Sequence, residues 1–206
     1  MVDKVVKRTV VALTAIGILA GAGGIASHAD ASRPPAATFT ADGKLVFPAD
    51  YRRWIYLSSG LGMSYTPTGS GMTMFDNVFV DRAAYETFVR TGTWPDGTML
   101  VLENRDARQD GSINRNGHFQ TGRMGVEVHV KDTARFKTGW AFFAFGGETP
   151  APMIPTSASC YACHAAHAAV DTTFVQFYPT LLPIAQEKDT LGVGYRADEA
   201  AAASAK

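Results

Sequence analysis

The segment Trp140-Ala141-Phe142-Phe143-Ala144-Phe145 contains only aromatic residues and alanine. Aromatic residues favour strands, and a strand without a polar position suits a place where both of its faces are buried. We therefore expect these six residues to form a β-strand at the core of a sheet, and the rest of the fold to be arranged around it.

Shorter apolar runs before this segment predict more strands. Asp81 follows the first of them and can cap a helix over residues 82–90, which Gly92 would end. A polar stretch at 104–117, rich in Gly and Asn, suits an exposed, hairpin-like connection. The predicted strands are residues 77–80, 98–103 and 123–130.

The C-terminal part has a different pattern. Residues 146–155 carry three prolines and cannot form regular structure, and residues 174–185 predict helical segments interrupted at Pro179 and Pro183. Strands grouped first and helices grouped last indicate an α+β fold, a mostly antiparallel sheet with short helices.

The first 31 residues have the pattern of a secretory signal peptide. A basic start precedes an apolar stretch and then small residues, which predicts cleavage after Ala29 or Ala31. An uncleaved membrane anchor is the alternative, but the apolar run is short for a spanning helix. We expect a flexible leader at 32–38, a folded domain at 39–195 and an Ala-rich tail at 196–206 that is frayed or helical. The protein should be periplasmic or otherwise exported.

The composition is that of an ordinary soluble domain. Of 206 residues, 46% are hydrophobic and 18% are charged, and 19 basic residues balance 19 acidic ones. A neutral balance gives no reason to expect a nucleic-acid partner, nor a membrane partner once the signal peptide is removed.

The strongest motif is Cys160-Tyr161-Ala162-Cys163-His164, because C-x-x-C-H is the attachment sequence for c-type haem. The two thiols can bond covalently to one edge of the porphyrin, and the adjacent imidazole can bind the iron. The chain has only two cysteines, so we expect one covalently bound haem c.

Two other uses of these residues fit the sequence less well. A disulfide or redox dithiol would fit an oxidising compartment, but it needs no histidine after the second cysteine. A zinc site could use His167 as a fourth ligand, but zinc sites usually draw their second ligand pair from farther along the chain.

Beyond the motif, the chain resembles the cytochrome P460 family, which includes the cytochromes c′-β. The resemblance covers nearly all of the predicted mature domain. It is carried by residues 47–54, 78–81 with Tyr85, 92–98, 125–127, 130–132 with Arg135-Phe136, 140–143, 160–164, Phe174 and 177–179.

The resemblance implies a homodimer and a five-coordinate haem whose distal side faces the sheet. Cytochrome P460 oxidises hydroxylamine, whereas cytochromes c′-β bind nitric oxide and carbon monoxide. The two branches differ by a lysine that P460 cross-links to the porphyrin, and the matching position here is Leu102. The resemblance therefore favours the ligand-binding branch.

Glu127 matches an acidic residue near the P460 haem. On a strand, Glu127 and His129 share one face, opposite Val126, Val128 and Val130. Alternation alone favours a face turned to water, whereas the resemblance turns Glu127 to the haem as a proton carrier. His129 is a further, weaker candidate for a sixth iron ligand.

Several apolar residues are candidates for the pocket. Leu102, Phe75, Phe79 and Phe143 are expected to roof the distal side, although aromatic residues at such spacing also serve as plain core. Met153 could reach the iron as in electron-transfer cytochromes, but most methionines fill gaps in the core.

Three functions follow. The leading one is an exported mono-haem cytochrome that binds a small gaseous or nitrogenous ligand at an open iron position. The runner-up is a hydroxylamine-oxidising enzyme with Glu127 as its catalytic proton acceptor and a separate redox partner. The third is an electron-transfer cytochrome with a sixth protein ligand.

Overall fold

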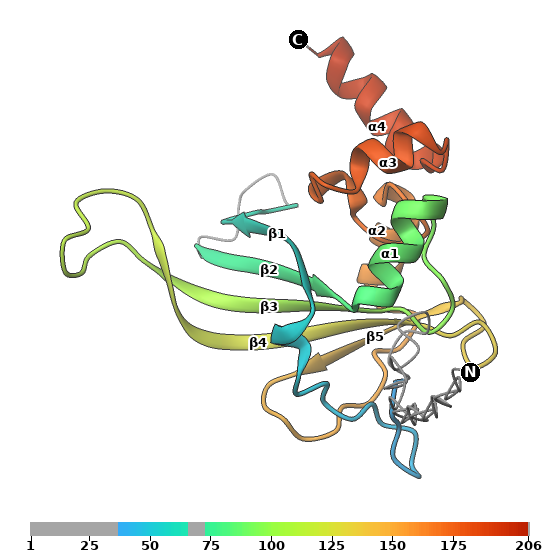
Figure 1. Ribbon diagram of the computed structural model, residues 1–206, viewed down its shortest axis with the longest axis horizontal. Coiled ribbons are helices and arrows are strands. Elements are labelled where there is room, and N and C mark those ends of the chain that lie inside the picture. Colours follow the sequence, from blue (N-terminus) through green and yellow to red (C-terminus); the bar gives the residue numbers. More distant parts are fainter. Residues whose placement is uncertain (1–36, 66–72, 206) are drawn as a thin grey trace, which may run out of the picture.

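A computed structural model describes residues 37–65 and 73–205. The predicted signal peptide and most of the predicted leader lie outside these residues. A single antiparallel sheet, with its strands in chain order, forms the centre of the domain (Figure 1). The strands are β1 (Ile55–Leu61), β2 (Met74–Val80), β3 (Met99–Arg108), β4 (Phe119–Lys131) and β5 (Trp140–Phe145).

Helices gather over one face of this sheet (Figure 1), which confirms the α+β class. None of the described helices is both long and apolar enough to cross a membrane. The helices are α1 (Arg82–Thr91), α2 (Ser159–His167), α3 (Leu182–Glu187) and α4 (Val193–Ser204), with short 3-10 turns at Tyr51–Arg53 and Val175–Phe177.

Helix α1 confirms the helix predicted for residues 82–90. The carboxylate of Asp81 accepts a hydrogen bond from the backbone N–H of Ala84, and thus caps the first turn. Gly92 ends the helix at φ 75°, a conformation that glycine adopts without strain. Phe88 packs its ring on that of Trp94, and it shares a buried cluster with Val80 and Leu100 of the sheet, which fixes the helix to the sheet.

Side chains alternate between the two faces of the sheet, and each face has its own core. On the face under the helices, here called the helical face, Val80, Leu100 and Phe142 pack against α1 and the C-terminal segments. On the opposite face, here called the far face, Val101 and Val128 pack against the N-terminal segment. The sheet therefore separates two hydrophobic clusters.

A buried carboxylate ties the N-terminal segment to the far face. Glu103 is 2% exposed, and its Oε2 accepts hydrogen bonds from Arg52 at 2.8 and 2.6 Å and from the hydroxyl of Tyr51. Its Oε1 accepts one from Arg105. Burial alone would raise the pKa of Glu103, but these hydrogen bonds outweigh burial and lower its pKa. Glu103 is thus a structural anion.

Strand β5 is buried, as expected, but it lies at the edge of the sheet and not in its middle. Other segments cover its outer edge. The N–H of Phe142 donates to the hydroxyl of Tyr161, and the carbonyl of Phe142 accepts from the N–H of Ile154 at 2.8 Å. Phe143 also forms an isolated bridge with Met153. Strand β5 is therefore apolar because these segments cover it, and not because it is a central strand.

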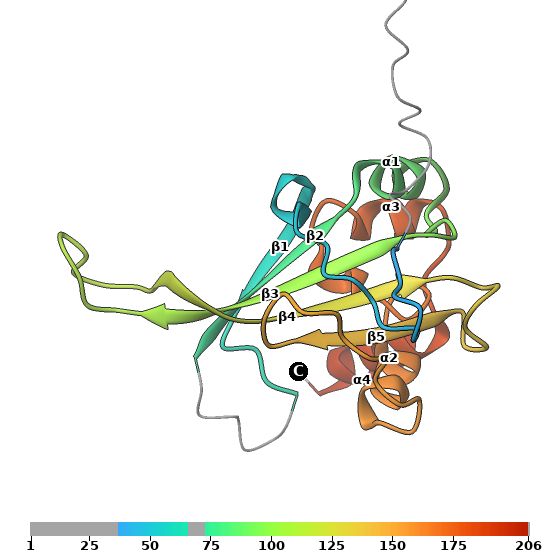
Figure 2. The ribbon, with the colours of Figure 1, turned by 90° about the horizontal axis from the view of Figure 1, so that it is seen from below.

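The β3–β4 hairpin is much longer than the sequence indicates. Strand β3 runs on to Arg108, into the stretch at 104–117 that we expected to be a loop, and β4 begins at Phe119, before the strand predicted for residues 123–130. The hairpin projects beyond the helices (Figures 1 and 2). Register shifts flank Arg105, and polar side chains there hide the alternation. Strand β1 is missing from the predictions because a bulge between Tyr56 and Ser58 breaks its period.

Two C-terminal predictions are refined. Pro183 lies in the first turn of α3, where proline starts a helix and does not interrupt it. Helix α4 begins inside the predicted domain and continues through the Ala-rich tail, which is helical.

Candidate functional site

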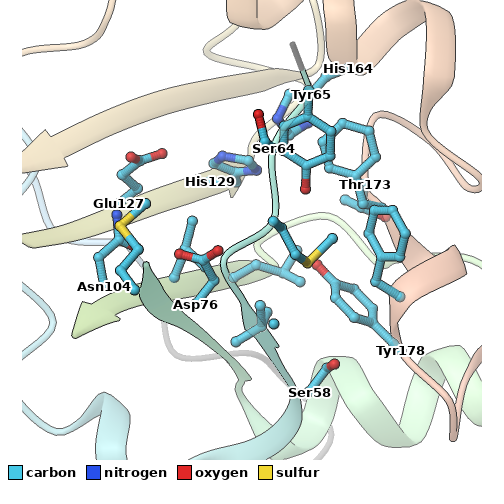
Figure 3. Close-up of a pocket in the computed structure, with 18 residues that line it drawn as sticks. Ser58, Ser64, Tyr65, Asp76, Asn104, Glu127, His129, His164, Thr173 and Tyr178 are labelled. Atoms are coloured by element: carbon cyan, nitrogen blue, oxygen red, sulfur yellow. The ribbon is translucent and has the colours of Figure 1, made fainter. Parts of the chain in front are cut away.

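A cavity of about 430 Å³ lies between the helical face and the C-terminal segments (Figure 3). Its volume is within the range of small-molecule and cofactor sites, roughly 300–1,000 Å³. Strands β1 to β4 supply one wall, and His164, Thr173, Phe174 and Tyr178 supply the other. The C-x-x-C-H helix, α2, thus brings its histidine to the cavity.

His164 is held in one ring orientation. Its Nδ1 lies 2.7 Å from the backbone carbonyl oxygen of Thr172, which can only accept a hydrogen bond. Nδ1 therefore carries the proton, and Nε2 is left with a lone pair for a metal. Burial lowers the pKa of His164, against the opposing effect of this hydrogen bond, so the ring is neutral at neutral pH.

Aromatic rings surround the His164 imidazole. The rings of Phe174 and Phe142 lie 4.3 and 4.8 Å away between centroids, and the ring of His129 lies edge-on at 4.8 Å. This packing fixes the imidazole from three sides.

Cys160 and Cys163 are both free thiols, partly buried, on α2. Residues three apart on a helix are neighbours, so the two thiols lie on one side of α2. A disulfide does not occupy them, and no cluster of three or more His, Cys, Asp or Glu suited to a metal ion occurs among the described residues. His167 instead pairs with Asp198 of α4 at 2.8 Å. Two thiols on one side of α2 and a free Nε2 on His164 are the groups that a c-type haem would need.

Leu102, Glu127 and His129 line the cavity from β3 and β4. The prediction from alternation, that Glu127 and His129 face water, is thus wrong. The valines that alternate with them pack in the far-face core instead. Burial first, and the charge of Asp76 second, raise the pKa of Glu127. Burial, with a smaller effect of His164, lowers the pKa of His129 to about 3, so this imidazole is neutral.

Three predicted pocket residues lie elsewhere. Phe75, Phe79 and Phe143 point to the far face, where Phe79 contacts Tyr51 and Phe143 contacts Phe39. All three alternate with the residues that do line the cavity, so their expected role is corrected. Phe79 and Phe143 pack in the far-face core, and Phe75 is half-buried. Met153, at 40% exposure beside β5, does not line the cavity either.

The polar end of the cavity is not among the features predicted from the sequence. Asp76 and Asn104 line it from β2 and β3 (Figure 3). Tyr65, which follows β1, also lines the cavity, but near His164, where its ring stacks on that of Phe174. The period of two gives a signal for both, because Asp76 precedes Val78 and Asn104 follows Leu102 on the same faces. Pairing of these strands would have been needed to see that the two polar residues meet.

Comparison with known proteins agrees with this geometry. A sequence model of the cytochrome P460 family matches residues 48–175, which is more than half of the chain. The chain belongs to the cytochrome P460 family. Membership implies a haem-binding cytochrome. A search of curated protein sequences finds no significant match.

The region that matches the cytochrome P460 family includes most of the cavity wall. It starts at the turn before β1 and ends in the segment after α2, so it contains the whole sheet, the C-x-x-C-H motif and Thr172. Helices α3 and α4 lie beyond it. The cavity is therefore built almost entirely from the family region, with Phe177 and Tyr178 added from outside.

Proposed function

We propose that the protein is an exported mono-haem c-type cytochrome, in which Cys160 and Cys163 bind the haem covalently and His164 is the iron ligand. The orientation of His164 carries this proposal. Thr172 holds the Nδ1 proton, so the only ring nitrogen with a free lone pair is Nε2, and the ring borders a cavity of cofactor size.

The contacts of His129 support a five-coordinate iron. Two imidazoles that ligate one iron from opposite sides need the iron between them, whereas the rings of His129 and His164 are already in contact. Met153 lies outside the cavity wall. We therefore assign no sixth ligand to either side chain.

A small neutral ligand such as nitric oxide or carbon monoxide suits this site. When bound, the haem would supply the coordination position and the redox chemistry. Val78, Leu100 and Leu102 would exclude water from the ligand, and Glu127 would hold a proton nearby. Export, a periplasmic location and assembly as a homodimer complete the proposal, supported by the N-terminal sequence and the family resemblance.

The experiment is to produce the protein with a cytochrome c maturation system and to record its ferric, ferrous and carbon monoxide-bound spectra. We expect one haem that resists acid-acetone extraction, a high-spin ferrous form and carbon monoxide binding. His164→Ala should keep the covalent haem and lose the iron-histidine stretch in resonance Raman spectra. Extraction of the haem, or a six-coordinate low-spin ferrous form, would contradict the proposal.

Hydroxylamine oxidation is the second candidate, and the position of Glu127 favours it. A carboxyl with a raised pKa, facing the cavity, is suited to accept a proton from a bound substrate. Leu102 argues against it, because the resemblance assigns the cross-linking lysine to that place. Turnover of hydroxylamine with a dye acceptor, abolished by Glu127→Gln, would favour the enzyme.

A further inference from the structure

The residues of the cavity wall form rows across the sheet. Val80, Leu100 and His129 pair in one row, and Val78, Leu102 and Glu127 pair in the next. Asp76 pairs with Asn104 in the row after that, with Gly60 on β1 and Gly125 on β4 as the outer partners. Polarity thus increases row by row, away from His164 (Figure 3).

The last row contains two buried oxygens that lack hydrogen-bond partners. Oδ1 of Asp76 and Oδ1 of Asn104 are both buried, and neither has a partner within the described ranges. Directly opposed residues on one face have Cβ atoms about 4.5–5.5 Å apart, so these side chains are neighbours. Buried acceptors without donors are unfavourable, because each loses its hydrogen bonds to water. A proton on Asp76, donated to Asn104, would satisfy both.

The charge of this wall is entirely acidic. Asp76 and Glu127 line the cavity, whereas no Lys or Arg does so among the described residues. The other titratable groups that face the cavity are Tyr65, His129, His164 and Tyr178. Asp106, which pairs with Met74 one row beyond Asp76, is exposed to solvent. No cationic side chain of the wall therefore offsets an ionised carboxylate.

We propose that Asp76 is a specificity-determining residue of this cavity: ionised, it excludes anionic ligands, and protonated on Asn104, it admits them. The inference rests on the proposed function, because it takes the cavity to be the ligand side of the haem. Burial raises the pKa of Asp76, and Asp76 in turn raises the pKa of Glu127. Both carboxyls thus ionise at a higher pH than is ordinary for a carboxyl, and the exclusion of anionic ligands becomes stronger as the pH rises.

Neutral ligands should be insensitive to this charge. Carbon monoxide carries no charge, so its binding does not change when Asp76 ionises. Fluoride stays an anion between pH 5 and about pH 8.5 and binds ferric haem, so it reports the charge directly. Comparing the two separates an electrostatic effect of Asp76 from a change in cavity shape.

The test measures fluoride and carbon monoxide affinity on haem-loaded protein over that pH range, for the wild type, Asp76→Asn, Asp76→Glu and Asp106→Asn. Asp106→Asn removes one carboxylate from the neighbouring strand β3, one row beyond Asp76 and outside the cavity. The ratio of fluoride affinities, Asp76→Asn over wild type, should rise from about 1 at the acid end to about tenfold at the alkaline end. Asp76→Glu should restore the wild-type pH profile.

Two outcomes would overturn the inference and are distinct from each other. A ratio that stays constant with pH, or one equal to that of Asp106→Asn, means that Asp76 does not select by charge, whatever the haem does. A wild type that binds neither fluoride nor carbon monoxide at any pH lacks the open iron position, and the proposed function fails with the inference. Glu127→Gln gives a second variant with the same expected direction.

Discussion

Gly194 of α4 lies directly against the backbone carbonyl of Ala166 in α2, so closely that a Cβ at Gly194 would overlap this oxygen. Only glycine allows the two helices to approach to this distance. The contact holds the C-terminal helix on the helix that carries the C-x-x-C-H motif, and Tyr195 is buried beside it. The family region ends before α4, yet α4 supports its central helix.

Gly194→Ala should lower the stability of the domain by about 1–3 kcal/mol, because the methyl group forces the helices apart. Thermal or urea denaturation measures this loss, and protease cleavage within α4 should become faster. Gly147→Ala is the matched control, since a Cβ there meets nothing within 4 Å. Equal stability of the two variants would mean that α4 does not need this contact.

Tyr161→Phe should destabilise the protein by about 1–2 kcal/mol, because the N–H of Phe142 loses its acceptor while the rings still stack. The hydroxyl also donates to Ile154 at 3.1 Å, so a second hydrogen bond is lost. Amide hydrogen exchange should become faster at Phe142. Tyr56→Phe removes a hydroxyl from a side chain that is 54% exposed and should change neither quantity.

Glu103→Gln should cost about 2–3 kcal/mol at neutral pH, since Arg52 and Arg105 lose their charged partner. The folded pKa of Glu103 is lowered, so its stabilisation is complete above its ordinary value of 4.5 and is lost as the pH falls through the folded pKa. The variant should therefore show a weaker loss of stability in acid. Glu148→Gln, at an exposed ion pair, should follow the wild-type profile.

Leu102 should leave the haem chemically unmodified beyond its two thioether bonds. A leucine side chain has no nucleophile, so it cannot attack the porphyrin edge. We expect an intact mass equal to the mature polypeptide plus one haem, and an ordinary c-type spectrum. Leu102→Met should behave in the same way. A mass that reveals another covalent bond would place the protein with the cross-linked enzymes.

Local signals in the sequence predicted the parts of the fold that depend on them. Asp81 and Gly92 are a cap and a stop with side-chain and backbone mechanisms, and they marked α1 correctly. The C-x-x-C-H motif selected His164, and the structure places this side chain at the cavity. Alternation grouped Glu127 with His129 on one face of β4, and both line the cavity.

Features that depend on pairing between distant segments could not be read in this way. The apolar composition of β5 gives its burial but not what buries it, because the cover comes from Ile154 and Tyr161. Composition also selected Phe75, Phe79 and Phe143 for the pocket, although both faces of the sheet are apolar. The role of Asp76 depends on the pairing of β2 with β3, which makes Asn104 its neighbour, and the sequence does not show this pairing.

The separation of two cores by one sheet constrains how the gene can change length. Along β3, Leu102 serves the cavity while Val101 and Glu103 serve the far-face core. Inserting or deleting one residue in β3 before Asn104 would turn its side chains to the opposite faces of the sheet. Glu103, the structural anion, would then point into the ligand cavity. Beyond the register shifts at Arg105, the β3–β4 hairpin neither lines the cavity nor packs in the far-face core. Insertions and deletions should therefore be tolerated at the tip of the hairpin, whereas selection should remove those at its base.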